Sequence, residues 1–378
     1  MKVGIVCEFN PFHNGHRYLL SEAKRRGGET VVCAMSGGFV QRGELAAYDK
    51  FRRAEAAVRN GADIVLENPF PFCCATAERF AASAVHIVSA SGLCDTLAFG
   101  CELGEESLYR ETAAFLTDET IEKKLRSSVS RQKNESYIRL REKAVREHLG
   151  EKNAALLQKP NSLLGLEYAC AIFRQNASLS LLPIPRIGAE HDGENPSENA
   201  SICSASYLRR RFDREAYMRF CPENTVDILD SPRRFSTEKL YAALRAKLLF
   251  SPVGRYFDVP SDYRDKMIRA AVREDCFDGF FDSLRAKHLT ESRLRHMILF
   301  TLFSVTDEEL SVLPDAALLL GASCDGRAVL KKRKETPCDF LVLPTLSHSK
   351  NASRRDRERL EKQTLAEKLG ETLSETTV

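Results

Sequence analysis

Residues 2–20, KVGIVCEFNPFHNGHRYLL, constrain the fold more than any other stretch of this chain. Residues 3–7 are an apolar, β-branched run that predicts a buried strand. Asn10 and Pro11 end that strand, because proline lacks a ladder donor and both residue types favour turns. From Asn14 onward the residues suit a helix. A strand, a turn and a helix in succession bring free backbone N–H groups and the positive end of a helix dipole to one point, which makes an anion site.

Two histidines, His13 and His16, stand in this turn with the spacing H-x-G-H. Because they are three residues apart at the start of a helix, both rings can face the same side of its first turn. Gly15 leaves the backbone uncovered, so a phosphate can approach closely. Two histidines at this spacing also occur on ordinary helix surfaces. The preceding strand, the proline turn and the glycine favour the phosphate site.

The composition is that of an ordinary soluble globular protein, with 43% hydrophobic and 29% charged residues. At 378 residues, the chain should form more than one compact unit. We expect no membrane span and no signal peptide, since Met1 leads directly into a strand. Twelve cysteines are scattered without a C-x-x-C pair, which favours buried thiols in a reducing cytoplasm over disulfides or zinc ligands. The net charge of +3 is too small to identify a nucleic-acid binder by itself.

The first hundred residues alternate predicted strands and helices. We predict strands at 30–35, 63–66 and 95–99, and helices at 50–60 and 76–90. This alternation is typical of a Rossmann-like parallel sheet with right-handed crossovers, in which ligands bind beyond the carboxyl ends of the strands. The residues expected to converge there are His13, His16, Gln41, Arg42, Glu67 and Gly100.

The next hundred residues add helices and a less regular strand. Residues 105–152 are charge-rich and predict an inserted helical element with a solvated face. A helix should open near residue 160, with Asn161 or Ser162 as its N-cap. Residues 180–187 predict an edge strand interrupted by prolines, and the polar residues 188–201 predict a mobile segment. Ser204 and Ser206 precede a helix, where their hydroxyls either grip a phosphate or act as ordinary N-caps.

Beyond residue 221, amphipathic helices replace the alternating pattern, at 237–250, 261–274, 277–287 and 292–303. We therefore expect an α/β unit at residues 1–215 and a mainly helical, partly basic unit at 216–378. The basic run in the second unit comprises Lys331, Lys332, Arg333 and Lys334. Such a run can follow a phosphate backbone, although a solvated surface is its more common meaning.

The H-x-G-H turn after a strand resembles the signature of the HIGH-type nucleotidyltransferase superfamily. An ordered series of blocks narrows this resemblance to the tRNA(Met) cytidine acetate ligases. The blocks are EFNPFHNGH, SGGFVQRGE, ENPFPFCCATAERFAASAV, FGCE, KPNSLLGLEY, PRIGAEHD and SAS-x-LR, followed by LTESRLRHMILFTLF and LLGASCDGRAVLKK. The resemblance covers nearly the full chain. Four positions depart from the pattern, because we would expect Asn at Gly38, an apolar residue at Asn68, Ser at Cys101 and Thr at Ser206.

The resemblance implies an ATP-dependent ligase. Acetate would attack the α-phosphate of ATP, and the amino group of the wobble cytidine in elongator tRNA(Met) would then take the acetyl group. His13 and His16 would stabilise charge on the phosphates rather than act as nucleophiles. The ATP-binding residues implied are Cys7, Glu8, Phe9, Asn10, Pro11, Phe12, His13, Asn14, Gly15, His16, Arg17, Tyr18, Leu19, Leu20, Gly100, Asn161, Arg186 and Ile187. Ser204 and Ser206 would form a second phosphate motif.

The helical half would hold the anticodon arm, and Lys331, Lys332, Arg333 and Lys334 are its candidate RNA contacts. An unpaired wobble base needs no duplex opening. ATP commonly brings Mg²⁺, although the sequence shows no acidic metal motif, and the oligomeric state stays open. One alternative is an adenylyltransferase acting on a small phosphorylated metabolite, which would use the same histidines. Another is a nucleotide-binding protein without catalysis.

Overall fold

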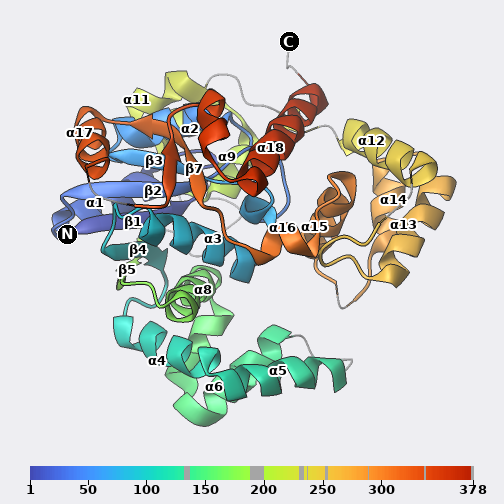
Figure 1. Ribbon diagram of the computed structural model, residues 1–378, viewed down its shortest axis with the longest axis horizontal. Coiled ribbons are helices and arrows are strands. Elements are labelled where there is room, and N and C mark those ends of the chain that lie inside the picture. Colours follow the sequence, from blue (N-terminus) through green and yellow to red (C-terminus); the bar gives the residue numbers. More distant parts are fainter. Residues whose placement is uncertain are drawn as a thin grey trace.

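A seven-stranded sheet forms the centre of the protein (Figure 1). The computed structural model describes residues 1–131, 137–187, 200–229, 234–235, 237–251, 254–287, 289–335 and 338–375. The strand order is β5-β4-β1-β2-β3-β7-β8, and within it only the β3–β7 pair is antiparallel. The strands are β1 (Lys2–Cys7), β2 (Thr30–Ser36), β3 (Ile64–Asn68), β4 (Thr96–Cys101), β5 (Ser180–Pro185), β7 (Ala316–Ala322) and β8 (Leu341–Leu343). The predicted α/β sheet with parallel strands is confirmed.

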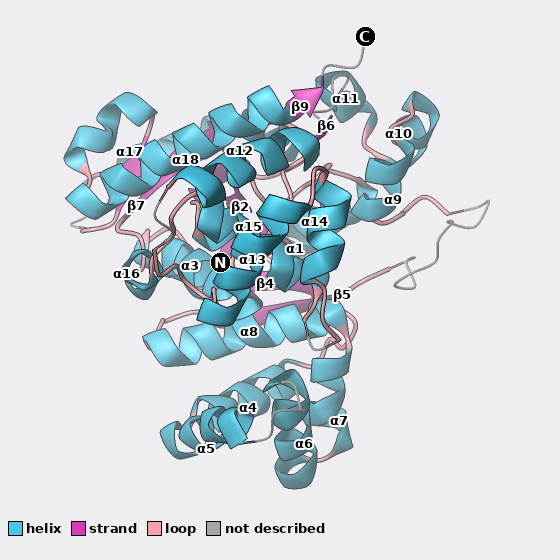
Figure 2. Ribbon diagram, turned by 90° about the vertical axis from the view of Figure 1, so that its right-hand side faces the viewer, coloured by secondary structure: helices cyan, strands magenta, loops and turns pink. Residues whose placement is uncertain are grey.

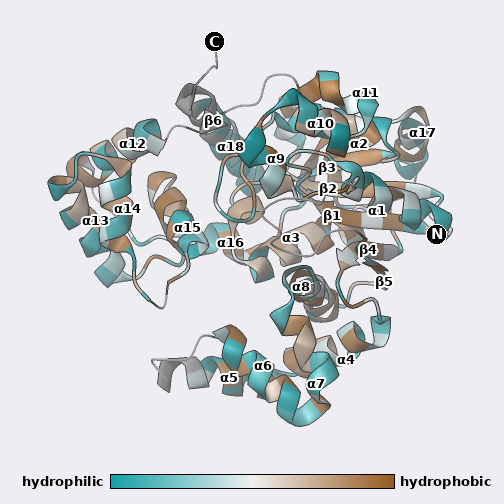
Figure 3. Ribbon diagram, turned by 180° about the vertical axis from the view of Figure 1, so that it is seen from behind, coloured by the Kyte–Doolittle hydropathy of each residue, from teal (hydrophilic) through white to brown (hydrophobic). Residues whose placement is uncertain are grey.

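Two hydrophobic cores cover the opposite faces of the sheet, because successive strand residues point to alternate sides. Helices α1 (Asn14–Arg25) and α2 (Lys50–Arg59) pack with Val3 and Ile5 on one face. Helices α3 (Ala77–Ala90) and α8 (Pro160–Gln175) pack on the other face. In Figure 3 the hydrophobic colours run through the central strands, and hydrophilic colours mark peripheral helices such as α10.

Two strands end later than the sequence predicts. Parallel pairing with β2 continues through Glu67 and Asn68, so Glu67 lies inside β3 rather than beyond its end. Gly100 lies inside β4, because its pairing with Ile184 of β5 extends that strand to Cys101. A single sequence does not reveal how far a neighbouring strand extends the pairing.

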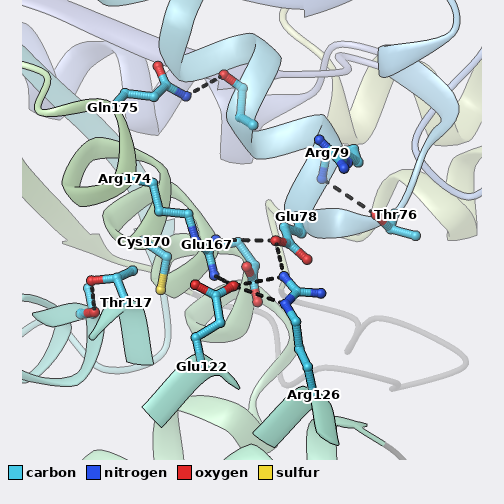
Figure 4. A network of polar contacts seen from close by, with 12 residues as sticks. Thr76, Glu78, Arg79, Thr117, Glu122, Arg126, Glu167, Cys170, Arg174 and Gln175 are labelled. Carbon is cyan, nitrogen blue, oxygen red and sulfur yellow. Dashed lines mark hydrogen bonds and ion pairs between the residues drawn. The ribbon is translucent and has the colours of Figure 1, made fainter. Parts of the chain in front are cut away.

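The predicted helical insertion is present and lies apart from the sheet (Figure 2). It comprises α4 (Glu106–Thr117), α5 (Glu119–Arg131), α6 (Tyr137–Leu149), α7 (Glu151–Ala154) and η2 (Ala155–Gln158). A network of ion pairs attaches α5 to α3 and α8 (Figure 4). In that network Arg126 lies 3.0 Å from Glu78 and 2.8 Å from Glu122, and Arg174 of α8 lies within 3.5 Å of both carboxylates.

The second half of the chain builds a helical core, to which residues 39–45 and 70–75 also contribute, and then returns to the sheet. The returning strand β7 pairs with β3, with Ala322 opposite Ile64. The sequence pattern predicts little strand here, because a short apolar run such as AALLLGA has no period that separates strand from helix. The sheet therefore draws on both of the expected units.

The remaining elements complete this half of the chain. They are α9 (Ala205–Arg211), α10 (Arg214–Phe220), α11 (Glu223–Val226), η3 (Asp227–Leu229), β6 (Arg234–Phe235), α12 (Thr237–Phe250), α13 (Ser261–Arg273), α14 (Phe277–Leu284), α15 (Glu291–Leu302), α16 (Asp307–Ser311), α17 (Cys324–Arg333), η4 (Leu346–Asn351), α18 (Arg354–Leu373) and β9 (Ser374–Glu375), with η1 (Phe72–Cys74) earlier in the chain. Most of the twelve cysteines are buried, and all are free thiols. Among the helices that can be described, none is long and apolar enough to cross a membrane. Most of the predicted mobile segment, residues 188–199, lies outside the described residues.

Candidate active site

The turn after β1 is held by buried aromatic side chains. Phe9 adopts a left-handed backbone conformation with φ of 47°, and both Phe9 and Phe12 are completely buried. Their rings pack edge to face, with centroids 5.0 Å apart, and the His16 ring lies 4.9 Å from Phe9. Such a conformation is unusual for a bulky residue and persists only where the surroundings impose it. This packing fixes the turn and the orientation of His16.

The two histidines form a capping box at the start of α1. The Gly15 N–H donates to Nδ1 of His13 at 3.1 Å, and the His13 N–H donates to Nδ1 of His16 at 3.3 Å. The rings stack with their centroids 3.6 Å apart and their planes at 22°. A neutral imidazole that accepts a hydrogen bond at Nδ1 carries its proton on Nε2. Each ring is therefore left with an Nε2–H group to donate.

Both histidines are neutral near pH 7. Burial lowers the pKa of His13 to about 3, with a further contribution from the positive charges of Arg186 and Arg209. Burial also lowers the pKa of His16 well below its ordinary value, helped by His13 and Arg186. The site thus offers two neutral N–H donors within the field of two arginines, which suits an incoming polyanion.

Gly15 has a steric role that the sequence does not reveal. A Cβ at this position would stand 2.9 Å from Cε1 of His13 and 3.3 Å from Cγ2 of Ile202. The missing side chain therefore leaves room for the His13 ring and for the segment that precedes α9. Gly15 also lines the cavity beside the histidines, as expected for a close approach of phosphate.

A cavity opens beside the histidines, beyond the carboxyl ends of β1 and β4. It holds about 810 Å³ of space not filled by atoms, its open mouth included. The expected ATP-binding residues that line it are Cys7, Glu8, Phe9, His13, Gly15, His16, Tyr18, Leu19, Gly100, Asn161, Arg186 and Ile187. Six others do not line it, namely Asn10, Pro11, Phe12, Asn14, Arg17 and Leu20.

A chain of polar contacts positions Arg186 at the cavity wall. The carboxylate of Glu102 accepts hydrogen bonds from Nδ2 of Asn161 at 2.7 Å and from the N–H of Ser162 at 2.8 Å. Oδ1 of Asn161 accepts from Arg186 at 3.3 Å. Although burial raises the pKa of Glu102, the hydrogen bonds from Asn161 and Ser162 outweigh it and lower the pKa.

The hydrogen bonds of Glu102 also show that the predicted N-cap of α8 is wrong. The helix begins at Pro160 after Lys159, and neither Asn161 nor Ser162 caps it with its own side chain. Glu102, from the end of β4, instead accepts from the free N–H groups of Asn161 and Ser162. A long-range carboxylate thus replaces the local cap that the sequence predicts.

The two serines of the expected second phosphate motif lie close to the histidines but do not line the cavity. Ser204 caps α9 by accepting from the Tyr207 N–H at 3.1 Å, and the Ser206 hydroxyl accepts from Arg209 at 3.2 Å. Arg209 also donates to the Asn10 carbonyl at 2.7 Å, which ties α9 to the β1–α1 turn.

Three residues of the site have roles that were not predicted. Arg53 is completely buried and donates to four carbonyl oxygens, those of Glu8, Ser36, Gly37 and Tyr48, which joins the ends of β1 and β2. Glu8 accepts from the Gln41 N–H at 2.8 Å. Tyr168 is 3% exposed and lines the cavity. Tyr168 belongs to the KPNSLLGLEY block, and that membership is the one signal that could have drawn attention to it.

The basic run at the end of α17 lies near the amino ends of β3 and β4, on the side of the sheet opposite to the histidines. α17 begins where the Ser323 N–H binds the Asp63 carbonyl, just before β3 starts, and Arg333 at its end donates to the Ser91 carbonyl, just before β4 starts. The histidines lie beyond the opposite ends of these strands, roughly 20 Å away for six residues at about 3.3 Å each. Arg333 is also engaged by Cys338 and Phe340, whereas Lys331, Lys332 and Lys334 are exposed.

Comparison with known proteins places this geometry among ATP-using enzymes. Residues 1–377 match the family model described as HIGH Nucleotidyl Transferase. A tRNA(Met) cytidine acetate ligase of Syntrophotalea carbinolica is 33% identical over 89% of this chain and 83% of its own. A protein of the same name from Lysinibacillus sphaericus is 32% identical over 91% and 88%. The crystal structure of Thermotoga maritima TmcAL bound with α-thio ATP superposes with a TM-score of 0.87 at 25% identity, over 99% of this chain and 95% of that one.

Proposed function

This chain belongs to the HIGH nucleotidyl transferase family, and we propose that it activates acetate with ATP and transfers the acetyl group to N4 of the wobble cytidine of elongator tRNA(Met). Relatives that bear the name of this activity align over about nine tenths of the chain. The observation that carries the proposal within the structure is the neutral, stacked pair of His13 and His16 at an open cavity. The reaction takes place where tRNA is found, in the cytoplasm.

The first step forms acetyl-adenylate. A carboxylate oxygen of acetate attacks the α-phosphorus of ATP, and the bond to the β-phosphate oxygen breaks to release pyrophosphate. Negative charge grows on the phosphate oxygens, where the Nε2–H groups of His13 and His16 can donate as the charge develops. Because both rings are neutral, each can donate a hydrogen bond from its Nε2–H group without transferring the proton.

The second step transfers the acetyl group. The N4 amine of cytidine attacks the acetyl carbon, the carbon–oxygen bond to AMP breaks, and the amine loses one proton. Acetate offers little surface for binding, so selection against larger acids requires a tight pocket.

The remaining wall of the cavity is assigned to the rest of the nucleotide. Gly100 would pass close to the nucleotide, and Asn161, Arg186 and Ile187 would hold its adenosine end. Glu102 fixes Asn161, which in turn accepts a hydrogen bond from Arg186. Ser204 and Ser206 would form the second phosphate motif, and Arg209, which donates to the Ser206 hydroxyl and to the Asn10 carbonyl, would hold it beside the turn. In the described parts of the chain, no group of three or more His, Cys, Asp or Glu side chains could hold a metal ion. Mg²⁺ that arrives with ATP would therefore be held mainly by phosphate oxygens and water.

The proposal is tested by incubating the purified protein with ATP, radiolabelled acetate and bulk bacterial tRNA. We expect label in the RNA that digests to N4-acetylcytidine, together with AMP and pyrophosphate. AMP joined to a small phosphorylated metabolite, without label in RNA, would refute the ligase and support an adenylyltransferase. ATP that binds but is never cleaved with any acid would refute catalysis altogether.

A further inference from the structure

A second cleft lies between the α/β sheet and the helical core. It encloses about 1230 Å³ of space not filled by atoms, its open side included. Its walls come from residues 43–47, the end of α9, and helices α12, α14 and α15. Of its lining residues, only Arg209 has a role assigned above.

The cleft wall is hydrogen-bonded to the turn that carries the histidines, although the cleft and the ATP cavity have no lining residue in common. Arg209 lines the cleft and donates to the carbonyl of Asn10, in the turn that carries the histidines, at 2.7 Å. Oδ1 of Asn10 accepts from the N–H of Ala47, another residue of the cleft wall, at 2.8 Å. Two hydrogen bonds to Asn10 therefore connect the cleft wall to the β1–α1 turn.

The cleft combines an apolar floor with a charged rim, whose lining residues include Glu44, Asp278 and Glu291 as well as Arg209, Arg285 and Arg295. Leu45, Phe277 and Ile298 line it and are buried. At its edge the guanidinium groups of Arg285 and Arg295 lie 5.4 and 5.7 Å from the centroid of the Phe281 ring. An apolar surface beside guanidinium groups suits an unpaired nucleobase and its phosphate.

The two rim arginines are oriented but still accessible. Glu291 lies 2.9 Å from Arg285 and 3.1 Å from Arg295, and the side chains of the two arginines remain 56% and 32% exposed. Asp282 and Glu44 make further contacts with them, so the rim carries carboxylates as well as arginines. An incoming phosphate would meet guanidinium groups whose positions are already set.

The surface around the β1–α1 turn and α9 adds further positive charge. Arg17, Arg42 and Arg210 are exposed, and within the described ranges their side chains make no hydrogen bond or ion pair. They flank the histidine turn, the loop that contacts Glu8, and α9. This distribution complements a phosphate backbone that passes from the cleft toward the ATP cavity.

We propose that this cleft binds the unpaired nucleotides of the RNA acceptor, with bases on the apolar floor and phosphates on Arg285 and Arg295. The proposal rests on the function proposed above and specifies where the tRNA is held. It assigns the main RNA contacts to the cleft rather than to the basic run at the end of α17.

The test is a double variant of the full-length protein, Arg285→Gln with Arg295→Gln. We expect the Kd for bulk bacterial tRNA to rise about tenfold or more, with the slope of log affinity against log salt reduced by about 1.4, or about 0.7 for each of two single-strand contacts. Acetate-dependent exchange of pyrophosphate into ATP should stay at the wild-type rate. The matched control is Lys331→Gln with Lys332→Gln, which removes the same charge from exposed residues of α17 and should leave tRNA binding unchanged.

Wild-type tRNA affinity in the double variant, or loss of affinity in the α17 control instead, would overturn the proposal. If the double variant is misfolded, as judged by its unfolding midpoint and ATP binding, ultraviolet cross-linking of wild-type protein to tRNA decides. Cross-links mapped to residues 277–299 support the cleft, whereas cross-links confined to α17 reject it. A wild-type protein that binds tRNA through the cleft but never acetylates it would refute the proposed function and leave the RNA surface standing.

Discussion

At the residue scale, the tautomers of the histidine pair lead to the first prediction. Nδ1 of His16 accepts a backbone hydrogen bond, so the Nε2–H group is its free donor. Replacing His16 by Ala removes a donor to the transition state and should slow acetate-dependent pyrophosphate exchange by about a hundredfold or more. His348, an exposed residue of η4, provides the control, because His348→Ala should keep the wild-type rate. Near-normal exchange in the His16 variant would contradict the assigned role.

The same pair predicts how stability depends on pH. Between pH 7 and pH 5, an unfolded histidine with its ordinary pKa of 6.5 gains a proton, whereas folded His13, with a pKa of about 3, does not. The unfolded state then binds more protons than the folded state. The free energy of unfolding should therefore decrease as the pH is lowered from 7 to 5, by on the order of 2 kcal/mol for His13. His16, whose pKa is also lowered in the folded protein, acts in the same direction.

Urea unfolding of the wild type and of His13→Gln at both pH values measures this effect. The variant lacks one titrating group, so its free energy of unfolding should fall less between pH 7 and pH 5. Identical losses in the two proteins would show that His13 is not held neutral by the fold.

The sequence was sufficient to predict the histidines but not the residues that position them. The H-x-G-H spacing and the strand before it are local signals, and the structure confirms the strand, the turn and the helix. Arg53 and Glu102 carry no local signal, because their partners lie on other strands and helices and only the fold brings them together.

At the element scale, two arginines attach the helical insertion to the rest of the protein. We expect them to contribute very differently to the free energy of unfolding. Arg141 of α6 and Glu167 of α8 form an ion pair in which both side chains are buried. Arg141→Ala would leave the Glu167 carboxylate buried without a countercharge, so it should lower the free energy of unfolding by roughly 3–5 kcal/mol. Arg126→Ala breaks the half-exposed network of Figure 4 and should lower the free energy of unfolding by about 1 kcal/mol or less.

Urea unfolding of the two variants at one pH provides the comparison. Each variant removes one guanidinium group from the same insertion, so Arg126→Ala serves as the matched control for Arg141→Ala. Equal losses of stability would contradict the view that burial of the Arg141–Glu167 pair sets its importance. The helices themselves could be predicted from charge and composition, but the ion pairs that attach them depend on which faces meet.

At the scale of the whole molecule, the carboxyl-terminal segment closes the sheet. β7 covers the edge of β3, and α18 places Gln363 and Glu367 against Glu67 and Lys50. The sequence predicts a surface helix or a frayed end here, because α18 is rich in Arg, Lys and Glu. Arg359 and Gln363 are each only 2% exposed. Buried polar residues with specific partners do not produce a hydrophobic pattern, so sequence periodicity could not predict this docking.

The return of the chain predicts that the α/β part cannot be isolated by truncation. A fragment of residues 1–220 loses β7, which leaves the N–H and C=O groups along Ile64–Leu66 of β3 unpaired at a sheet edge. It also loses α18, which exposes the buried Lys50–Glu67 pair. We expect this fragment to elute as aggregates in size-exclusion chromatography, and a separate chain of residues 305–375, supplied by co-expression, should restore solubility and ATP binding.

A monomeric 1–220 fragment that binds ATP as tightly as the full chain would show that the sheet does not need its last two strands. If the fragment instead aggregates, loss of tRNA acetylation after truncation says nothing about where RNA binds, because the ATP site is lost with the fold. Point substitutions on the intact chain are then the appropriate way to locate the RNA surface, since they leave β7 and α18 in place.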